Sequence, residues 1–374
     1  MLALPAPLRD ALDARGLGLT VVVLRLGAMG DIVRTLPAVR LVRRALPDAR
    51  IHWVAWSPWT ALLAEHPDLD ATIPLPRSEL RRLSSSPLSW PALGTAVGRI
   101  VREIRAVDAG LVLDFHGDLR AGVLGFLSGA GVRLGYDGHQ QKEGNRFFTT
   151  DRVPAGDRRR SRIERNLDLV RALGFPDAPL PGAGIDLGDD DKRAAEAALR
   201  PLIAPGGAYA VINPGASLKQ AYKRPPAELL AAAATALAEE EICPIVVCGP
   251  GEEDDARRVI EASRGLAKLV PSTSLKSLAA LLTGARVFIG GDSGPLHLAC
   301  GVSCPVVGLY GPTDPVVNSP WNVPFRALTP SGSVYCGIKR KDRVVNSFAG
   351  LEPVAVSRAV HDLVALPRTI TASR

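Results

Sequence analysis

Residues 287–314 constrain the fold of this chain more than any other stretch, because short apolar runs alternate there with glycine-rich turns. The run at 287–289 is β-branched and aromatic, and it stops at Gly290-Gly291. Asp, Ser and Pro then follow at 292, 293 and 295, where their residue types favour the start of a helix. A second apolar run at 305–310 ends in a turn at 311–314. The pattern predicts a strand, turn and helix, then a second strand and turn.

The turns after these two predicted strands are suited to hold an anion. Ligands of open α/β sheets bind at the carboxyl ends of strands. A helix N-terminus adds free N–H groups and the positive end of its dipole. His297 lies one helical turn further on, and we interpret it as a phosphate contact rather than a histidine paired within its helix. We therefore expect a phosphate or diphosphate site built from Asp292, Ser293, Gly294, His297, Gly311 and Thr313.

The same alternation fills the rest of the 374 residues and predicts two α/β domains. In the first half we expect strands at 20–26, 50–56 and 110–115, and a helix at 32–45 that Pro37 would kink or interrupt. This βαβ order implies a parallel sheet with helices on both faces.

A Pro- and Gly-rich stretch at 176–190 is the expected linker. The predicted domains are 1–180 and 181–350, followed at 351–374 by a helix that packs back on the N-terminal domain. The second half is predicted to contain, in order, helix 192–202, strand 209–213, helix 226–238, strand 243–248, helices 252–263 and 275–282, the elements of 287–310, and a tail helix 354–366.

Most of the net charge of +7 falls in the first half, with arginine clusters at 77–82 and 158–165. Charge runs are usually solvated faces, but an anionic partner for the N-terminal half is the sharper interpretation. Aromatic residues make up only 5% and do not interleave with the arginines, which argues against nucleic acid. An acidic lipid or an anionic sugar at a membrane surface fits better.

No signal peptide or membrane-spanning run is visible, so a cytoplasmic protein is expected. The five cysteines favour free thiols, because their number is odd and several lie in apolar runs. Cys300 and Cys304 lack a second pair at ligand spacing, and three aspartates at 189–191 precede a helix, where capping is the simpler interpretation. No metal site is expected.

Outside 287–314, two turns of the first half carry candidate site residues. The turn at 27–31 is not a G-x-G-x-x-G dinucleotide fingerprint, and no ribose-binding acid follows at the usual distance. Asp31 is therefore either a helix cap or a carboxylate directed at a ligand. His116 and Asp118 follow another strand and could serve the same site.

Two turns of the second half suit a nucleotide. Ser217 supplies a hydroxyl, Lys223 a point charge and Arg224 a bidentate donor for phosphate, although an ordinary exposed loop is the alternative. Gly249 and Glu252 end another strand. The carboxylate there could accept from ribose hydroxyls or simply complement a helix dipole.

Taken together, these residues resemble the bacterial heptosyltransferases of glycosyltransferase family 9, which build the lipopolysaccharide inner core. The resemblance covers about residues 20–315, and its motifs occur in the order of the family. They are LRLGAMGDIVRTLPA at 24–38, RRALPDARIHW at 43–53, LDFHG at 113–117, RLGY at 133–136, KEG at 142–144, PGAS at 214–217, KR at 223–224, GPGE at 249–252, DSGPLH at 292–297 and GPTD at 311–314.

The resemblance implies a GT-B fold, two Rossmann-like domains whose parallel sheets face each other across a cleft. It implies inverting, metal-independent transfer of heptose from ADP-heptose, held by the C-terminal domain. The implied acceptor is an anionic, lipid-linked sugar of the Kdo/heptose–lipid A type, held by the N-terminal domain. Beyond this nucleotide sugar no cofactor is implied, and peripheral contact with the cytoplasmic face of the inner membrane is expected.

By position, Asp31 resembles the general base of the family, a role for which burial would raise its pKa toward the working range. Glu252 resembles a ribose ligand, with Glu253 as an equally placed alternative. The diphosphate clamp and donor contacts would be Ser217, Lys223, Arg224, Asp292, Ser293, Gly294, His297, Gly311 and Thr313. The acceptor-side candidates are Gly30, Arg81, Arg82, His116 and Lys142.

The chain departs from the family pattern in three places. Pro225 stands where a Trp often follows the Lys-Arg pair, the segment 218–222 is slightly long, and Cys336 stands alone where many members carry several cysteines. These departures favour a divergent acceptor. The alternatives are a same-fold transferase with another nucleotide sugar or a non-lipid acceptor, a nucleotide-sugar epimerase or hydrolase, and a noncatalytic donor-binding relative.

Overall fold

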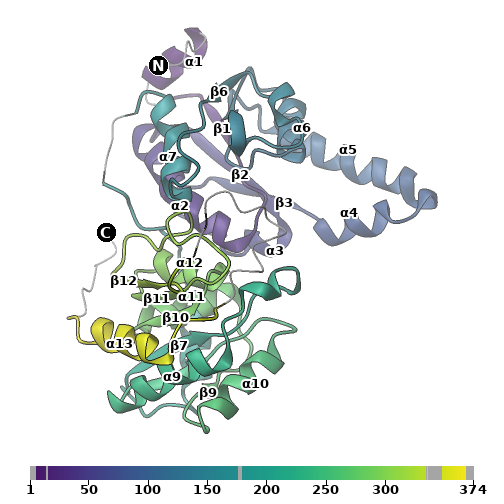
Figure 1. The fold of residues 1–374 in the computed structure, drawn as a ribbon. Helices are drawn as coiled ribbons and strands as arrows, with labels where there is room; N and C mark the ends of the chain where they lie inside the picture. Colours follow the sequence, from purple (N-terminus) through teal and green to yellow (C-terminus); the bar gives the residue numbers. More distant parts are fainter. Residues whose placement is uncertain (1–5, 14–15, 176–178, 334, 336–347, 368–374) are drawn as a thin grey trace. The chain divides into compact units, whose positions relative to one another are not determined.

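The computed structural model describes residues 6–13, 16–175, 179–333, 335 and 348–367 (Figure 1). They form two compact units that divide between Asp186 and Leu187. Each unit contains a six-stranded parallel sheet with helices packed on it. The predicted α/β class, with two Rossmann-like units, is confirmed. No helix in the described ranges is long and apolar enough to cross a membrane.

The sheet of the first unit has the strand order β3-β2-β1-β4-β5-β6. The strand β1 pairs with β2 on one side and with β4 on the other, so the order reverses between β1 and β4. Such a switch point leaves a crevice at the carboxyl ends of the two strands, where ligands of these sheets bind. The strands are β1 (Thr20–Leu24), β2 (Arg50–Trp56), β3 (Ala71–Leu75), β4 (Leu111–Asp114), β5 (Val132–Tyr136) and β6 (Asp151–Val153).

The helix α2 (Met29–Ala45) leads away from the switch point and continues through Pro37. The predicted interruption there is wrong. A proline inside a helix costs about 3 kcal/mol, but Val33, Leu36, Val39 and Val42 are all fully buried. Burial of one such side chain contributes about 1.5–3 kcal/mol, so the apolar face outweighs the lost hydrogen bond.

The helices α4 (Arg77–Ser84) and α5 (Trp90–Ala106) form a hairpin joined by the short turn η1 (Pro87–Ser89). This α4–α5 hairpin extends away from the sheet of the first unit (Figure 1). The other helices of the unit are α1 (Ala6–Asp13), α3 (Ser57–Thr60), α6 (Leu119–Leu127) and α7 (Arg162–Ala172), with 3₁₀ turns η2 (Gly138–Gln140) and η3 (Asn145–Phe147).

The second unit repeats this topology, with the strand order β12-β11-β10-β7-β8-β9. Its order reverses between β7 and β10, which pair directly in parallel. Ligands of such sheets bind where these two strands end. The strands are β7 (Tyr209–Asn213), β8 (Cys243–Val246), β9 (Lys268–Leu269), β10 (Phe288–Gly291), β11 (Val306–Leu309) and β12 (Phe325–Leu328).

The last described helix, α13 (Pro353–Val364), packs against α9 (Ala227–Glu239) in the core of the second unit. Its buried residues include Val356, Val360 and Leu363, so its apolar face packs into the core of this unit. The remaining helices are α8 (Asp189–Leu199), α10 (Glu253–Ala262), α11 (Leu275–Gly284) and α12 (Gly294–Gly301), with the 3₁₀ turn η4 (Leu218–Lys223).

Candidate active site

Asp31 lies at the switch point of the first unit, in the first turn of α2 after β1. The N-cap of this helix is Ala28, so Asp31 does not cap it. Its side chain is 22% exposed and accepts from two guanidiniums, Arg34 at 2.7 Å and Arg25 at 3.0 Å. Arg162 at the start of α7 adds a third at 3.6 Å. Three cations from separate elements therefore surround one carboxylate.

These three arginines give the Asp31 carboxyl a different pKa from the one expected from burial alone. Burial raises the pKa of its carboxyl, but the charges of Arg25, Arg34, Arg162 and His116 outweigh that effect and hold the pKa well below 3.8. The prediction that burial raises it toward neutral is wrong, because the arginines stabilise the charged form. Asp31 is therefore deprotonated at every physiological pH and is a weak base. It can accept a proton only from an oxygen that has already become acidic by forming a new bond.

The arginines around Asp31 are themselves held in place. Arg25 donates to the main-chain carbonyl of Phe115, just after β4, and Arg34 Nε donates to the Gly30 carbonyl at 3.1 Å. Asn166 on α7 donates to the Arg34 carbonyl at 2.9 Å. The geometry of the site thus depends on β1, β4, α2 and α7 together.

A second polar cluster follows β4 at the same switch point. His116 Nε2 lies 3.2 Å from Asp118 Oδ2, and Asp118 also accepts from Arg120. Asp114 is buried and accepts from the N–H groups of His116 and Gly117, each at 2.9 Å, and from Asn145 at 2.7 Å. The loop that presents His116 is therefore fixed by its own hydrogen bonds. His116 acts on Asp31 electrostatically, since it lowers the pKa of that carboxyl.

The other acceptor-side candidates lie on separate segments of the first unit. Gly30 is buried in the first turn of α2, next to Asp31. Lys142 is exposed, and its N–H donates to the Gly117 carbonyl at 2.8 Å, which places its backbone beside the His116 loop. Arg81 and Arg82 lie on α4, exposed to solvent.

In the second unit, Asp292, Lys223 and His297 come together where β10 ends. Lys223 Nζ donates to Asp292 Oδ2 at 3.1 Å and to its main-chain carbonyl at 3.2 Å. His297 Nε2 lies 3.3 Å from Asp292 Oδ1. The three side chains are at most 15% exposed. A lysine and a histidine thus flank one carboxylate beside the N-terminus of α12, the region where the sequence predicts an anion site.

The turn after β7 meets this cluster from the other side of the switch point. Ser293, the N-cap of α12, directs its hydroxyl to Asn213 Oδ1 at 3.4 Å, and Gly294 is the first residue of the helix. Ser217 is exposed at the start of η4. Ser217 therefore lies at the surface of this turn.

The Arg224 side chain bonds to protein groups of the turn after β7 and of α10. Its guanidinium donates to the Ala216 carbonyl at 3.0 and 2.6 Å and to Asp255 on α10 at 2.6 Å. These bonds tie the turn after β7 to α10. The geometry therefore favours a positioning role for Arg224 over the expected phosphate contact.

Glu252 fits between two glycine turns. Its carboxylate accepts from the Gly249 N–H at 2.9 Å. A Cβ at Gly215 would lie 1.8 Å from Glu252 Oε2, so only glycine leaves room for the carboxylate there. Glu253, the sequence alternative, bonds the N–H of Gly251 at the surface instead. The structure therefore favours Glu252 as the residue directed at the crevice.

Gly311 and Thr313 follow β11, beside β10 in the sheet. Both are buried, and the Thr313 hydroxyl has no hydrogen-bond partner among the described residues. Tyr335 donates to the Gly311 carbonyl at 3.2 Å. Cys336 and the basic residues after it lie outside the described residues.

The structure adds functional candidates that sequence reasoning missed. Arg25, Arg34 and Arg162 define the ionisation of Asp31, and Asn213 orients Ser293. Helical spacing could have suggested Arg34, which is three residues after Asp31. Nothing in the local sequence links Arg162 to Asp31, because that contact depends on how α7 packs against α2.

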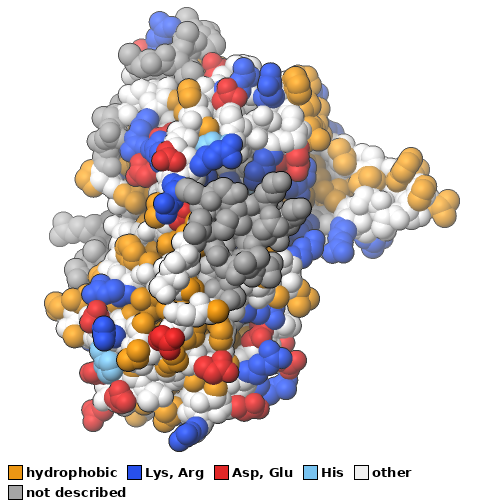
Figure 2. Space-filling view, in the orientation of Figure 1, with side chains coloured by type: hydrophobic (Ala, Val, Ile, Leu, Met, Phe, Trp, Pro, Cys, Tyr) orange, Lys and Arg blue, Asp and Glu red, His pale blue; other side chains and the backbone are white. Residues whose placement is uncertain are grey.

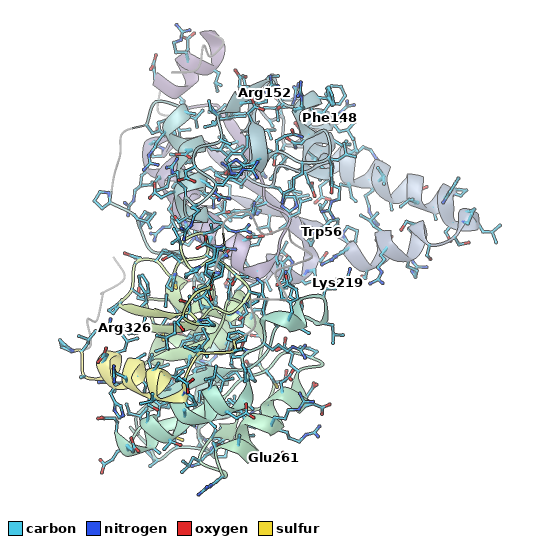
Figure 3. All side chains as sticks on the ribbon, in the orientation of Figure 1. Trp56, Phe148, Arg152, Lys219, Glu261 and Arg326 are labelled. Carbon is cyan, nitrogen blue, oxygen red and sulfur yellow. The ribbon has the colours of Figure 1, made fainter. Side chains whose placement is uncertain are left out.

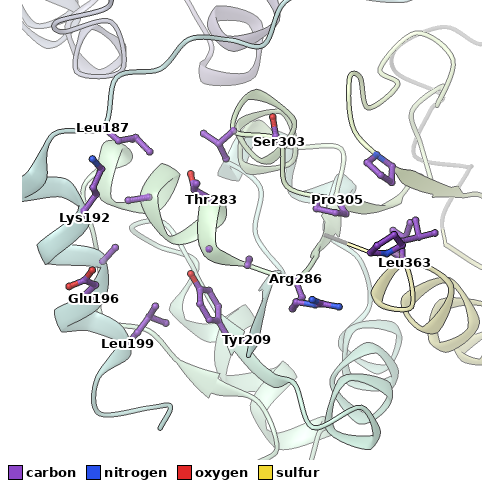
Figure 4. Close-up of a pocket in the computed structure, with 18 residues that line it drawn as sticks. Leu187, Lys192, Glu196, Leu199, Tyr209, Thr283, Arg286, Ser303, Pro305 and Leu363 are labelled. Atoms are coloured by element: carbon purple, nitrogen blue, oxygen red, sulfur yellow. The ribbon is translucent and has the colours of Figure 1, made fainter. Parts of the chain in front are cut away.

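A pocket of about 530 Å³ lies at the amino ends of the strands of the second sheet, away from the carboxyl ends that the predicted site residues follow (Figure 4). Its lining includes Tyr209, Arg286 and Pro305, at the amino ends of β7, β10 and β11. None of the predicted site residues lines it, so it is separate from the cluster of Lys223, Asp292 and His297.

Comparisons with known proteins identify the family of this chain. The profile of glycosyltransferase family 9 (heptosyltransferase) matches residues 97–342. Lipopolysaccharide heptosyltransferase 1 of Pseudomonas aeruginosa is 28% identical over 79% of each chain. Lipopolysaccharide heptosyltransferase 1 of Escherichia coli K12 is 26% identical over 79% of this chain and 88% of its own.

Solved structures show the same fold. A family 9 glycosyltransferase from Veillonella parvula superposes with a TM-score of 0.76 at 21% identity, covering 92% of this chain and 97% of its own. The E. coli heptosyltransferase WaaC, solved with ADP-2-deoxy-2-fluoro heptose, gives 0.70 at 22% identity and covers 92% and 99%. The paired Rossmann-like sheets are thus those of GT-B heptosyltransferases. By sequence profile and by fold, this chain is a member of glycosyltransferase family 9, the heptosyltransferases, and is therefore a glycosyltransferase.

Proposed function

We propose that this enzyme transfers a heptose from ADP-heptose to an anionic, lipid-linked sugar of the lipopolysaccharide inner core, of the Kdo/heptose–lipid A type. The observation that carries the proposal is the Lys223–Asp292–His297 cluster at the N-terminus of α12, which suits a nucleoside diphosphate. The names of the relatives supply the sugar and the acceptor class. Membership of family 9 favours transfer over the epimerase, hydrolase and noncatalytic alternatives.

In the proposed reaction the acceptor hydroxyl attacks the anomeric carbon of the heptose. A new C–O bond forms on one face as the bond to the diphosphate oxygen breaks on the other, which inverts the configuration. ADP leaves with the electron pair, and the hydroxyl proton passes to the carboxylate of Asp31. Because the pKa of Asp31 is held low by its three arginines, this proton would move late, after the attacking oxygen has become acidic.

The leaving diphosphate needs positive charge at the moment when the C–O bond breaks. Lys223, the N–H groups at the start of α12 and the hydroxyls of Ser293 and Ser217 would supply it, in fixed positions. Glu252 would accept from the ribose hydroxyls. With these groups to stabilise the leaving diphosphate, we propose metal-independent transfer that needs no other cofactor.

We also propose that the first unit binds the acceptor. Its arginines and His116 match an anionic sugar, and a lipid-linked acceptor would bring the protein to the cytoplasmic face of the inner membrane as a peripheral protein.

A nucleotide-sugar screen by thermal unfolding tests the donor. ADP and ADP-heptose should raise the melting temperature, since a ligand at a hundred times its Kd adds about 2.7 kcal/mol of stability. UDP and GDP sugars are the matched controls. Asp31→Asn should bind ADP normally and lose transfer by two to four orders of magnitude, the usual contribution of a general base. Stabilisation by a UDP or GDP sugar alone, or near-normal transfer by the variant, would refute the assignment.

A further inference from the structure

The end of the α4–α5 hairpin is exposed, apolar and uncharged. From residue 83 to residue 98 the sequence contains no Asp, Glu, Lys or Arg. Leu88 is 95% exposed and Trp90 is 62% exposed, and Val97 on the next turns of α5 is 41% exposed. Single exposed apolar side chains are ordinary, but several on one uncharged tip are typical of a surface that binds something.

This tip belongs to an ordered hairpin. Leu83, Ala96, Ile100 and Ile104 are buried on its inner faces, and α4 packs against α5. Arg99 on α5 pairs with Glu79 on α4 at 3.0 Å. The exposed side chains are therefore presented on a built scaffold that extends from the sheet (Figure 1).

A cationic hollow adjoins the same hairpin. A pocket of about 530 Å³ lies between α3 and α4, and no acidic side chain lines it. In Figure 2 the apolar end of the projection is flanked by Lys and Arg side chains. The pocket is lined by three arginines, three serines and a proline: Arg77, Arg81, Arg82, Ser57, Ser78, Ser85 and Pro58.

One of these arginines lies over an aromatic ring. Arg77 lies 6.0 Å from the ring centroid of Trp56, which ends β2 and is labelled in Figure 3. Arg120, from α6, lies over the same ring at 5.9 Å. Such a cation–π contact contributes about 0.5–1 kcal/mol at an exposed site, and it uses none of the N–H donors that a guanidinium offers to an anion.

We infer that the α4–α5 hairpin docks the enzyme on the surface of an anionic lipid bilayer. Leu88 and Trp90 enter the interfacial region, where an indole ring with one polar edge is at its most stable. Arg81 and Arg82 then meet headgroup phosphates. An apolar, uncharged tip directly beside a cluster of arginines matches the layering of an anionic bilayer, apolar chains below charged headgroups, so this pattern favours a bilayer. The inference rests on the proposed function in one respect: docking would give the enzyme access to a lipid-linked acceptor.

Vesicle flotation tests this docking without any substrate. The wild-type enzyme should bind vesicles of phosphatidylethanolamine and phosphatidylglycerol and bind phosphatidylcholine vesicles weakly. Leu88→Ser/Trp90→Ser should lower the partition coefficient at least tenfold. Arg81→Gln/Arg82→Gln should lower it about thirtyfold at low salt, since each basic residue near the surface contributes about fivefold.

Phe147→Ser is the matched control, because Phe147 is 78% exposed in the same unit but lies outside the hairpin. Its binding to vesicles should equal that of the wild type. Equal binding by Leu88→Ser/Trp90→Ser, an equal loss in the control, or no binding by the wild type would each overturn the inference. ADP affinity, measured on the same preparations, should be unchanged in the hairpin variants. A chain that binds vesicles but not ADP would refute the proposed function and leave the docking surface standing.

Discussion

Replacing Lys223 by methionine tests whether the cluster at α12 is a diphosphate site. Lys223 makes two bonds to Asp292, at 3.1 and 3.2 Å, and is 15% exposed. Methionine keeps most of the length of the side chain and removes its charge. The Asp292 carboxylate, 5% exposed, would then lose its lysine partner and keep its contact with His297.

Two separate losses follow from this geometry. Removing one partner of a buried pair costs about 3–5 kcal/mol of folding stability, and the partial exposure of Lys223 argues for the lower end of that range. For ligand binding, a hydrogen bond to a charged group contributes about 1.5–3 kcal/mol, which corresponds to a loss of roughly ten- to hundredfold in ADP affinity. Repulsion between Asp292 and the diphosphate would push the loss toward the upper value.

Calorimetric titration with ADP and with adenosine distinguishes loss of a contact to the diphosphate from general damage to the nucleoside site. Lys223→Met should weaken ADP binding as stated and leave adenosine binding within about twofold. Lys219→Met is the matched control, because Lys219 is an exposed lysine of the same turn η4 (Figure 3). Unchanged ADP affinity in Lys223→Met would remove Lys223 from the site. An equal loss of adenosine would show that the loop, rather than the phosphate contact, had been damaged.

Two further predictions concern Asp31 and Glu252. The pKa of Asp31 is lowered in the fold, so its contribution to stability is present above the unfolded value of about 3.9 and is lost as pH falls through the folded pKa. The difference in melting temperature between wild type and Asp31→Asn should therefore be wide at pH 7 and at pH 5 and narrow only below about pH 4; a difference that vanished near pH 6 would contradict the low pKa. Gly215→Ala places a Cβ 1.8 Å from Glu252 Oε2 and must displace that carboxylate, so adenosine binding should weaken about tenfold or more, the loss of one charged hydrogen bond. Normal adenosine affinity in this variant would exclude Glu252 as a ribose ligand.

The sequence predicted parallel sheets and the strands that lead into each site, because buried parallel strands are short, apolar and bounded by glycine-rich turns. The strand at 209–213 agrees with β7 residue for residue, and the turn at 292–294 leads into α12 as expected. The residues that bond one another within a turn or across adjacent strand ends, such as Lys223 and Asp292, could thus be grouped in advance.

Contacts that depend on packing between distant elements could not be predicted in this way. The pKa of Asp31 was expected to rise with burial, and it falls because Arg162 on α7 and Arg25 after β1 converge on it. The α4–α5 hairpin was also missed. Its Ser-, Pro- and Gly-containing stretch at 84–98 has the composition of a loop, and its helices are stabilised by burial of a few residues against each other.

The division of the chain between Asp186 and Leu187 has a consequence for how such enzymes diversify. Every residue that we assign to the nucleotide follows the carboxyl end of a strand in the second unit. The proposed base and its arginines belong to the first unit. On the proposed assignment, recognition of the donor and recognition of the acceptor are encoded in separate, contiguous halves of the sequence. A new acceptor could be acquired by changing or exchanging the first half alone, while the machinery that binds the activated sugar is inherited intact.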